Sequence, residues 1–397
     1  TFPHRQNVYL VLTRGKMKLS KSIKVLGAAI AVAVLAAPSA VAAVSLTGAG
    51  ATFPGPIIEA CKAGYNKETG NTFTYGLGGS GAGRTASDKQ TGIVNFSDTP
   101  HLAAREGVIH LPVVAGPIAV MYNIGNSKPL YLSPATVAGI FGGTITKWND
   151  PKIVADNNRS VKEVLYKTDG KGNTVKDKAG KPVVLREVDR KIRYTLPNKP
   201  IKVIYRSDSS GTTGAFTAAL NGAAPEVWTK AGNNAFGSTF PGSLNDKANL
   251  GRITGASGSA AVAAAAAKTQ YSVTYAESAY AKDNGLAIAN IKNEAGNWQA
   301  PTSGGVSAFL GAATVSAKGI VTFDYKTKVA GSYLFGTTSY ALVDTKQKDA
   351  ETAKAVRDLL SYLLDPKCPA TDPKQEFTTI TGALRDVNLK LIAQITN

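Results

Sequence analysis

The chain has 397 residues, of which 43% are hydrophobic, and 45 Lys and Arg against 27 Asp and Glu give it a formal net charge of +18. This apolar content is ample for a buried core, which excludes a globally disordered chain. With 3 His and 2 Cys, the chain lacks the ligands for zinc ribbons, iron–sulfur clusters and His-rich metal sites. The positive charge admits an anionic partner but does not identify one.

Residues 17–43 have the pattern of a secretory signal peptide. Lys18, Lys21 and Lys24 precede an apolar run over 25–37, and small residues follow at 38–43. The run is too short and too rich in alanine for a good permanent membrane span. We predict that 17–43 is cleaved on export, that 1–16 is upstream, non-native sequence, and that the mature protein is periplasmic or extracellular.

Short apolar strands alternate with helical stretches along the mature chain, which is typical of an α/β fold. Strands are expected at 44–47, 72–77, 113–122 and 201–205. Helices are expected over 57–65, from a cap at Ser257 or Ser259 to Ala267, and from a cap at Asp349 to a stop at Asp365-Pro366.

Residues 166–202 form a basic block, with eleven Lys and Arg against four Asp and Glu. Asp169-Gly170 and Ala179-Gly180 are turn signals, and short strands are expected at 183–185 and 192–194. We interpret the block as a projecting hairpin-like insertion. It is either a solvated surface loop or a surface for acidic partners.

Four turns place glycines and small hydroxyl residues where a strand is expected to lead into a helix. They are residues 48–54, 78–83, 97–100 and 206–212. A helix N-terminus leaves backbone N–H groups free, glycine lets a ligand approach closely, and Ser and Thr add donors. Each turn taken alone is also explained by ordinary helix capping.

Arg206 and Asp98 give these turns their chemical character. Arg206 follows a strand directly, where its guanidinium can make a two-pronged contact to an oxyanion. Ionised Asp98 only accepts hydrogen bonds, so it suits an anion that carries a proton, such as hydrogen phosphate, and opposes sulfate. The alternative roles for Asp98 are a salt bridge to Arg206 or Arg84, or a helix cap.

Seven segments of the chain form a set of motifs: 45–54 (SLTGAGATFP), 67–71 (KETGN), 79–81 (GSG), Ser97-Asp98, 145–150 (ITKWND), 206–212 (RSDSSGT) and 275–281 (YAESAYA). With these motifs the chain resembles the phosphate-binding proteins of bacterial phosphate ABC importers. The family's order of motifs is kept over most of the mature chain.

The resemblance implies a two-lobed, hinged periplasmic-binding-protein fold with the ligand cleft between the lobes. Lobe 1 would comprise 44–125 and 300–397, and lobe 2 would comprise 126–299 with the insertion at 166–202. The implied protein is a monomer without a cofactor that binds inorganic phosphate and delivers it to a membrane permease by hinge closure. No stable nucleic-acid partner is expected.

Carried over position by position, the resemblance also implies the phosphate contacts. They are Thr52, Phe53, Ser80, Asp98, Arg206, Ser210, Gly211 and Thr212. One departure is Ser80-Gly81, where the family usually has two serines. Another is Arg84, one helical turn beyond Ser80, for which we expect a bridge to a carboxylate.

Other classes of function remain open on the sequence. A phosphatase on the same scaffold would need a base, and His101 and His110 are the only imidazoles of the mature chain. An adhesion or nucleic-acid-binding surface protein would use the basic insertion. Cys61 and Cys368 are candidates for a disulfide in an exported protein, with two buried free thiols as the alternative.

Overall fold

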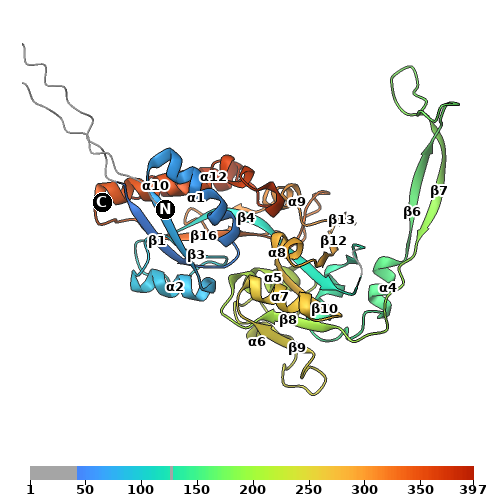
Figure 1. The fold of residues 1–397 in the computed structure, drawn as a ribbon, viewed down its shortest axis with the longest axis horizontal. Coiled ribbons are helices and arrows are strands. Elements are labelled where there is room, and N and C mark those ends of the chain that lie inside the picture. The colour runs from blue at the N-terminus through green and yellow to red at the C-terminus, as the bar shows by residue number, and fades with distance from the viewer. Residues whose placement is uncertain (1–42, 126–127) are drawn as a thin grey trace, which may run out of the picture. The chain divides into compact units, whose positions relative to one another are not determined.

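The computed structural model describes residues 43–125 and 128–397, and 43–397 form one compact unit (Figure 1). The predicted upstream segment and all but the last residue of the predicted signal peptide lie outside the described residues. Among the described residues, the structure contains no helix with the length and apolar character needed to cross a membrane.

The main sheet has nine strands, in the order β2-β1-β3-β16-β4-β10-β8-β9, with β11 added against β4. The strands are β1 (Ser45–Gly50), β2 (Thr72–Leu77), β3 (Asn95–Ser97), β4 (Val108–Asn123), β8 (Lys202–Arg206), β9 (Ile253–Ala256), β10 (Ser272–Glu277), β11 (Ala287–Ile288) and β16 (Gly336–Asp344). Parallel and antiparallel neighbours are mixed, with β1-β2 parallel and β16-β4 antiparallel.

Strand β4 joins two parts of this sheet. Residues 108–117 pair with β16, and residues 118–123 pair with β10. Its nearly continuous apolar sequence is buried over 110–122, as expected for a strand covered on both faces. We call β2, β1, β3, β16 and 108–117 the first half-sheet, and 118–123, β10, β8 and β9 the second half-sheet.

Helices pack around both half-sheets (Figure 1). They are α1 (Gly55–Thr69), α2 (Gly79–Lys89), α3 (Pro134–Phe141), α4 (Pro151–Asn157), α5 (Gly211–Ala223), α6 (Phe236–Thr239), α7 (Ser259–Lys268), α8 (Ser278–Asp283), α9 (Ser303–Leu310), α10 (Ala350–Leu363), α11 (Lys367–Ala370), α12 (Gly382–Ile392) and the 3-10 helix η1 (Pro373–Gln375). The remaining short strands are β5 (Tyr131–Leu132), β12 (Asn290–Lys292), β13 (Trp298–Gln299), β14 (Thr314–Val315) and β15 (Val321–Thr322).

Two predicted helix starts have different outcomes. Asp349 caps α10 as expected, because its carboxylate accepts a hydrogen bond from the backbone N–H of Thr352 at 2.6 Å. The cap predicted for α7 was wrong. The residue before this helix is Gly258, at φ 88°, and Ser259 is the first helical residue. The Ser259 hydroxyl is therefore available for contacts outside its own helix.

The basic insertion is a two-stranded hairpin of β6 (Arg159–Tyr166) and β7 (Val184–Ile192), drawn green in Figure 1. The hairpin begins before residue 166, so the predicted start was wrong. A single strand occupies 184–192, in place of the two short strands expected at 183–185 and 192–194. Within the described part of the chain, the two strands form a separate sheet and pair only with each other. Most of the residues of the insertion are exposed.

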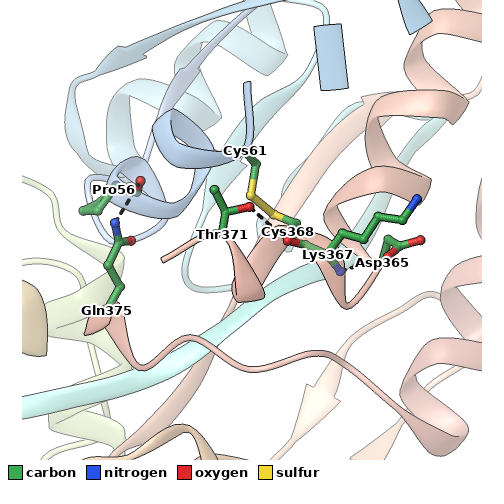
Figure 2. Close-up of a disulfide and its surroundings, with 7 residues drawn as sticks. All are labelled: Pro56, Cys61, Asp365, Lys367, Cys368, Thr371 and Gln375. Atoms are coloured by element: carbon green, nitrogen blue, oxygen red, sulfur yellow. Dashed lines mark hydrogen bonds between the residues drawn. A yellow bond between two sulfur atoms is a disulfide. The ribbon is translucent and has the colours of Figure 1, made fainter. Parts of the chain in front are cut away.

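A disulfide joins the two ends of the described chain. Cys61 on α1 and Cys368 on α11 are 307 residues apart in sequence, with a Cα–Cα distance of 5.2 Å. Figure 2 shows this link beside a further contact between the same regions, in which the Gln375 side chain reaches the backbone oxygen of Pro56 at 3.5 Å. The helix that follows Thr52 and Phe53 is thus fastened to the C-terminal helices.

Candidate anion-binding site

The eight carried-over residues lie on turns at the edges of the two half-sheets. Thr52 and Phe53 lie between β1 and α1, Ser80 lies in the first turn of α2, and Asp98 follows β3. Arg206 ends β8, and 210–212 begin α5. All eight are buried. Residues nearly 160 positions apart in sequence therefore share one region of the interior.

Close contacts join the turn after β3 to the start of α5. The backbone N–H of Asp98 donates to Ser80 Oγ at 3.0 Å, and Thr212 Oγ1 donates to Asp98 Oδ2 at 3.1 Å. Gly211 packs closely against Ser80 and Asp98, because a Cβ added at Gly211 would be 2.2 Å from Ser80 Oγ and 2.8 Å from Asp98 N. Only glycine allows this approach.

Asp98 is 3% exposed, and its carboxylate is held by hydroxyl groups. Ser339 donates to Oδ1 at 2.8 Å, while Thr212 donates to Oδ2. Burial raises the pKa of Asp98 to about 6, although these hydrogen bonds and the positive charges of Arg206 and Arg84 oppose the rise. At neutral pH the group is mainly ionised, so it is a buried hydrogen-bond acceptor.

Several expectations about this region were wrong. The turn at 97–100 leads into a loop and then β4, and no helix follows it, so Asp98 is not a helix cap. Arg206 and Arg84 act on Asp98 through space, without a salt bridge. Arg84 does not bridge to a carboxylate; it donates to Ser97 Oγ at 3.2 Å and to the backbone oxygens of Thr99 and Pro100 at 3.1 Å. Arg84 therefore braces the turn that presents Asp98.

Arg206 is 1% exposed and makes its two-pronged contact within the protein. Nε donates to Asp208 Oδ1 at 2.7 Å, and Nη2 donates to Asp208 Oδ2 at 2.6 Å. Burial opposes the charge of Arg206, but the bonds to Asp208 outweigh it and raise the pKa of Arg206. The same bonds outweigh burial at Asp208 and lower its pKa. Both groups thus stay charged.

The structure adds residues that the sequence did not identify. The third guanidinium nitrogen, Nη1, donates to Ser259 Oγ at 3.1 Å. Ser259 in turn lies 2.9 Å from Thr52 Oγ1 and donates to Glu277 Oε1 at 3.0 Å. Tyr275 on β10 lies 2.6 Å from Thr213 Oγ1 and accepts from the backbone of Arg206. Glu277 lies within the matched motif at 275–281, but nothing local assigned it to the site.

The remaining carried-over residues have structural contacts of their own. Ser210 Oγ caps α5 by accepting from the backbone N–H of Thr213 at 3.1 Å, and its proton remains able to donate. The ring of Phe53 packs edge-on against Phe377 in the core. The N-terminus of α5 and the polar groups of Thr52, Ser80 and Arg206 together suit a small oxyanion.

The chemistry of the described residues does not favour a metal site. Among them, no group of three His, Cys, Asp or Glu side chains could hold a metal ion. His101 lies 2.9 Å from Asp88, and His110 Nε2 accepts from the backbone N–H of His101 at 3.0 Å. Both imidazoles therefore have partners outside the anion-binding residues.

Comparison with known proteins assigns the family. A family model described as a PBP superfamily domain matches residues 36–367. The phosphate-binding protein PstS 3 of Mycobacterium tuberculosis is 32% identical over 307 residues, which cover 73% of this chain and 70% of that protein. The chain belongs to the PstS family of phosphate-binding proteins. PstS of Haemophilus influenzae is 33% identical over 275 residues, which cover 68% of each chain.

Solved structures agree with the two-lobed fold implied for a PstS-family chain. The structure of a high-affinity periplasmic phosphate-binding protein bound with phosphate matches with a TM-score of 0.61 at 21% identity. The match covers 88% of this chain and 93% of that one. At this identity the likeness shows the fold, and the fold class predicted from the sequence is confirmed. The lobe boundaries remain a prediction.

Proposed function

We propose that this protein binds inorganic phosphate between its two half-sheets and delivers it to the permease of an ABC importer. The observation that carries the proposal is a buried, ionised acceptor, Asp98, set among hydroxyl donors, a helix N-terminus and Arg206. Such a set binds an anion that brings its own proton. Membership of the PstS family supports the same ligand.

Each carried-over residue has a role in this proposal. Thr52, Ser80 and Ser210 supply hydroxyl donors, while Phe53, Gly211 and Thr212 supply backbone N–H groups, because the Thr212 hydroxyl gives its proton to Asp98. Arg206 uses three of its five N–H groups in the bonds to Asp208 and Ser259, so two remain for the anion. Asp98 accepts the proton of hydrogen phosphate.

The proposal includes export and a binding role without catalysis. The proposed contacts of the anion are the charged side chains of Arg206 and Asp98, hydroxyl groups and backbone N–H groups. His101 and His110 have their partners elsewhere, so neither imidazole is placed to act as a base. The protein is expected to act as an exported monomer whose lobes close over phosphate.

Calorimetry of residues 44–397 with phosphate and with sulfate at pH 7.5 tests the proposal. We expect tight phosphate binding and a sulfate affinity lower by at least a factor of 100, since sulfate leaves Asp98 facing an unprotonated oxygen. Equal affinities would contradict a phosphate receptor. Turnover of a phosphate ester would contradict the absence of catalysis.

A further inference from the structure

The Ser259 hydroxyl contacts three polar side chains. Its Oγ lies 2.9 Å from Thr52 Oγ1, 3.1 Å from Arg206 Nη1 and 3.0 Å from Glu277 Oε1. Its backbone N–H also donates to Thr52 Oγ1 at 3.4 Å. All four residues are buried, with Ser259 fully so. Two of its neighbours, Thr52 and Arg206, are proposed phosphate contacts, which places the Ser259 hydroxyl beside the same anion.

The Ser259 hydroxyl has one proton, and the groups around it determine where that proton can be donated. Arg206 can only donate, so Ser259 accepts from it. An ionised Glu277 can only accept, so it takes the Ser259 proton. A protonated Glu277 can instead donate to Ser259 Oγ, and the Ser259 proton is then free to point to the anion or to Thr52 Oγ1, 2.9 Å away. The charge on Glu277 therefore decides what Ser259 can donate to.

Glu277 is an unusual carboxyl group in this fold. It is 1% exposed, and Oε2 has no hydrogen-bond partner among the described residues. The charged groups that face it are Arg206 on β8, which favours its ionised form, and Asp98 after β3, which opposes it. Tyr280 on α8 is the further titratable neighbour. Burial is the largest influence and raises the pKa of Glu277 to about 7.

We propose that Ser259 is a further contact of the bound anion, and that Glu277 is a positioning residue which frees the Ser259 proton when neutral. This inference rests on the proposed function. It also gives the site a hydroxyl at the start of α7. This chain has Ser80-Gly81 on α2 where the family usually has two serines, so Ser259 adds a donor to a site with one hydroxyl fewer. Ionisation of Glu277 weakens binding twice, because it withdraws the Ser259 proton and adds a negative charge near the anion.

Replacement of Ser259 tests the contact. Calorimetry with phosphate at pH 5.5 should show about tenfold weaker binding for Ser259→Ala than for the wild type. Ser272→Ala is the matched control, because Ser272 is also fully buried but donates to the backbone oxygen of Ala266. It should change phosphate affinity by less than twofold. Equal affinities of Ser259→Ala and wild type would overturn the contact.

Replacement of Glu277 tests the positioning role through pH. Gln is neutral and can donate to Ser259, so Glu277→Gln should match the wild type within twofold at pH 5.5 and bind phosphate at least fivefold more tightly at pH 8.5. Comparing variants at the same pH removes the titration of phosphate itself. Asp344→Asn, which changes a carboxylate paired with Arg105 outside the site, should show no such dependence. A ratio that is the same at both pH values would overturn the role of Glu277.

Different results would overturn the role of Ser259 and Glu277 and the binding of phosphate itself. A wild type that binds phosphate while both variants leave its affinity unchanged at both pH values overturns this inference and leaves the proposed function standing. A wild type that does not bind phosphate overturns the proposed function and, with it, the inference.

Discussion

The anion-binding region and the β6–β7 hairpin hold positive charge in opposite ways. Arg206 is 1% exposed, and its guanidinium is bonded to Asp208 and Ser259. On the hairpin, Lys162 and Arg190 have side chains 76% and 64% exposed, with carboxylates 3.8 Å away. Water and salt screen the hairpin charges, whereas a buried charge acts over a low dielectric. The net charge of +18 is therefore a weak indicator of the ligand, and the buried charge of Arg206 is a stronger one.

Loss of Arg206 should have the largest effect. Arg206→Ala removes the only cation proposed to touch the anion and leaves Asp208 unpaired, so phosphate affinity should fall by roughly 2–4 kcal/mol in calorimetry. Arg105→Ala, which breaks a partly exposed ion pair with Asp344, is the matched control and should leave affinity unchanged. An Arg206→Ala affinity within about threefold of the wild type would show that the carry-over to Arg206 is wrong.

Removing the disulfide should lower the stability of the fold without affecting the hairpin. Cys61→Ser with Cys368→Ser opens a link across 307 residues and should lower the free energy of unfolding by about 2–4 kcal/mol in urea titrations. The strands of the hairpin pair with each other and with no other described strand, so the proteolytic sensitivity of the hairpin should not change. Counting free thiols in the unfolded, oxidised wild type checks the link itself, and two free thiols would contradict it.

Lowering the pH should reduce the preference for phosphate over sulfate. The pKa of Asp98 is raised to about 6, so its carboxylate takes up a proton as the pH falls through 6 and can then donate to sulfate. Sulfate affinity should rise by about tenfold between pH 7.5 and pH 5, measured by calorimetry at constant ionic strength. The rise should be smaller in the Asp98→Asn variant, in which Asp98 no longer titrates and Glu277 still does. A sulfate affinity that does not depend on pH would count against an ionised Asp98 facing the anion.

The hairpin should have the smallest effect on the site. Replacing four exposed lysines with Gln removes four charges, yet phosphate affinity should change by less than twofold at 0.15 M salt. The residues are Lys171, Lys176, Lys178 and Lys181. A larger loss of phosphate affinity would show that the hairpin steers or contacts the anion. The hairpin charges would then not be screened from the site.

Local signals in the sequence predicted local structure well. β2 spans Thr72–Leu77 as expected, and Asp349 caps α10, because strand composition and capping depend on neighbouring residues. The start of the hairpin was missed because no turn signal marks the beginning of β6 at Arg159. Ser259 was assigned to a cap because its real partners lie 18 to 207 residues away.

Some residues of the site can be predicted from the sequence, and others depend on contacts that form only on folding. Glycine-rich turns and Arg206 stand out in the sequence because their residue types are specific. Glu277 and Ser339 do not, since their contribution comes from folding β10 and β16 against the turns that carry Thr52 and Asp98. The phosphate contacts themselves remain predictions to be tested.

Selection of phosphate by Asp98 can be measured by titrating phosphate and sulfate into wild type and Asp98→Asn at pH 7.5. Asn keeps the shape but can donate, so sulfate should no longer face an obligate acceptor. We predict that the preference for phosphate over sulfate shrinks by about 1–3 kcal/mol in the variant, the range for an unsatisfied buried polar group. An unchanged ratio of the two affinities would contradict the claim that Asp98 selects phosphate by accepting its proton.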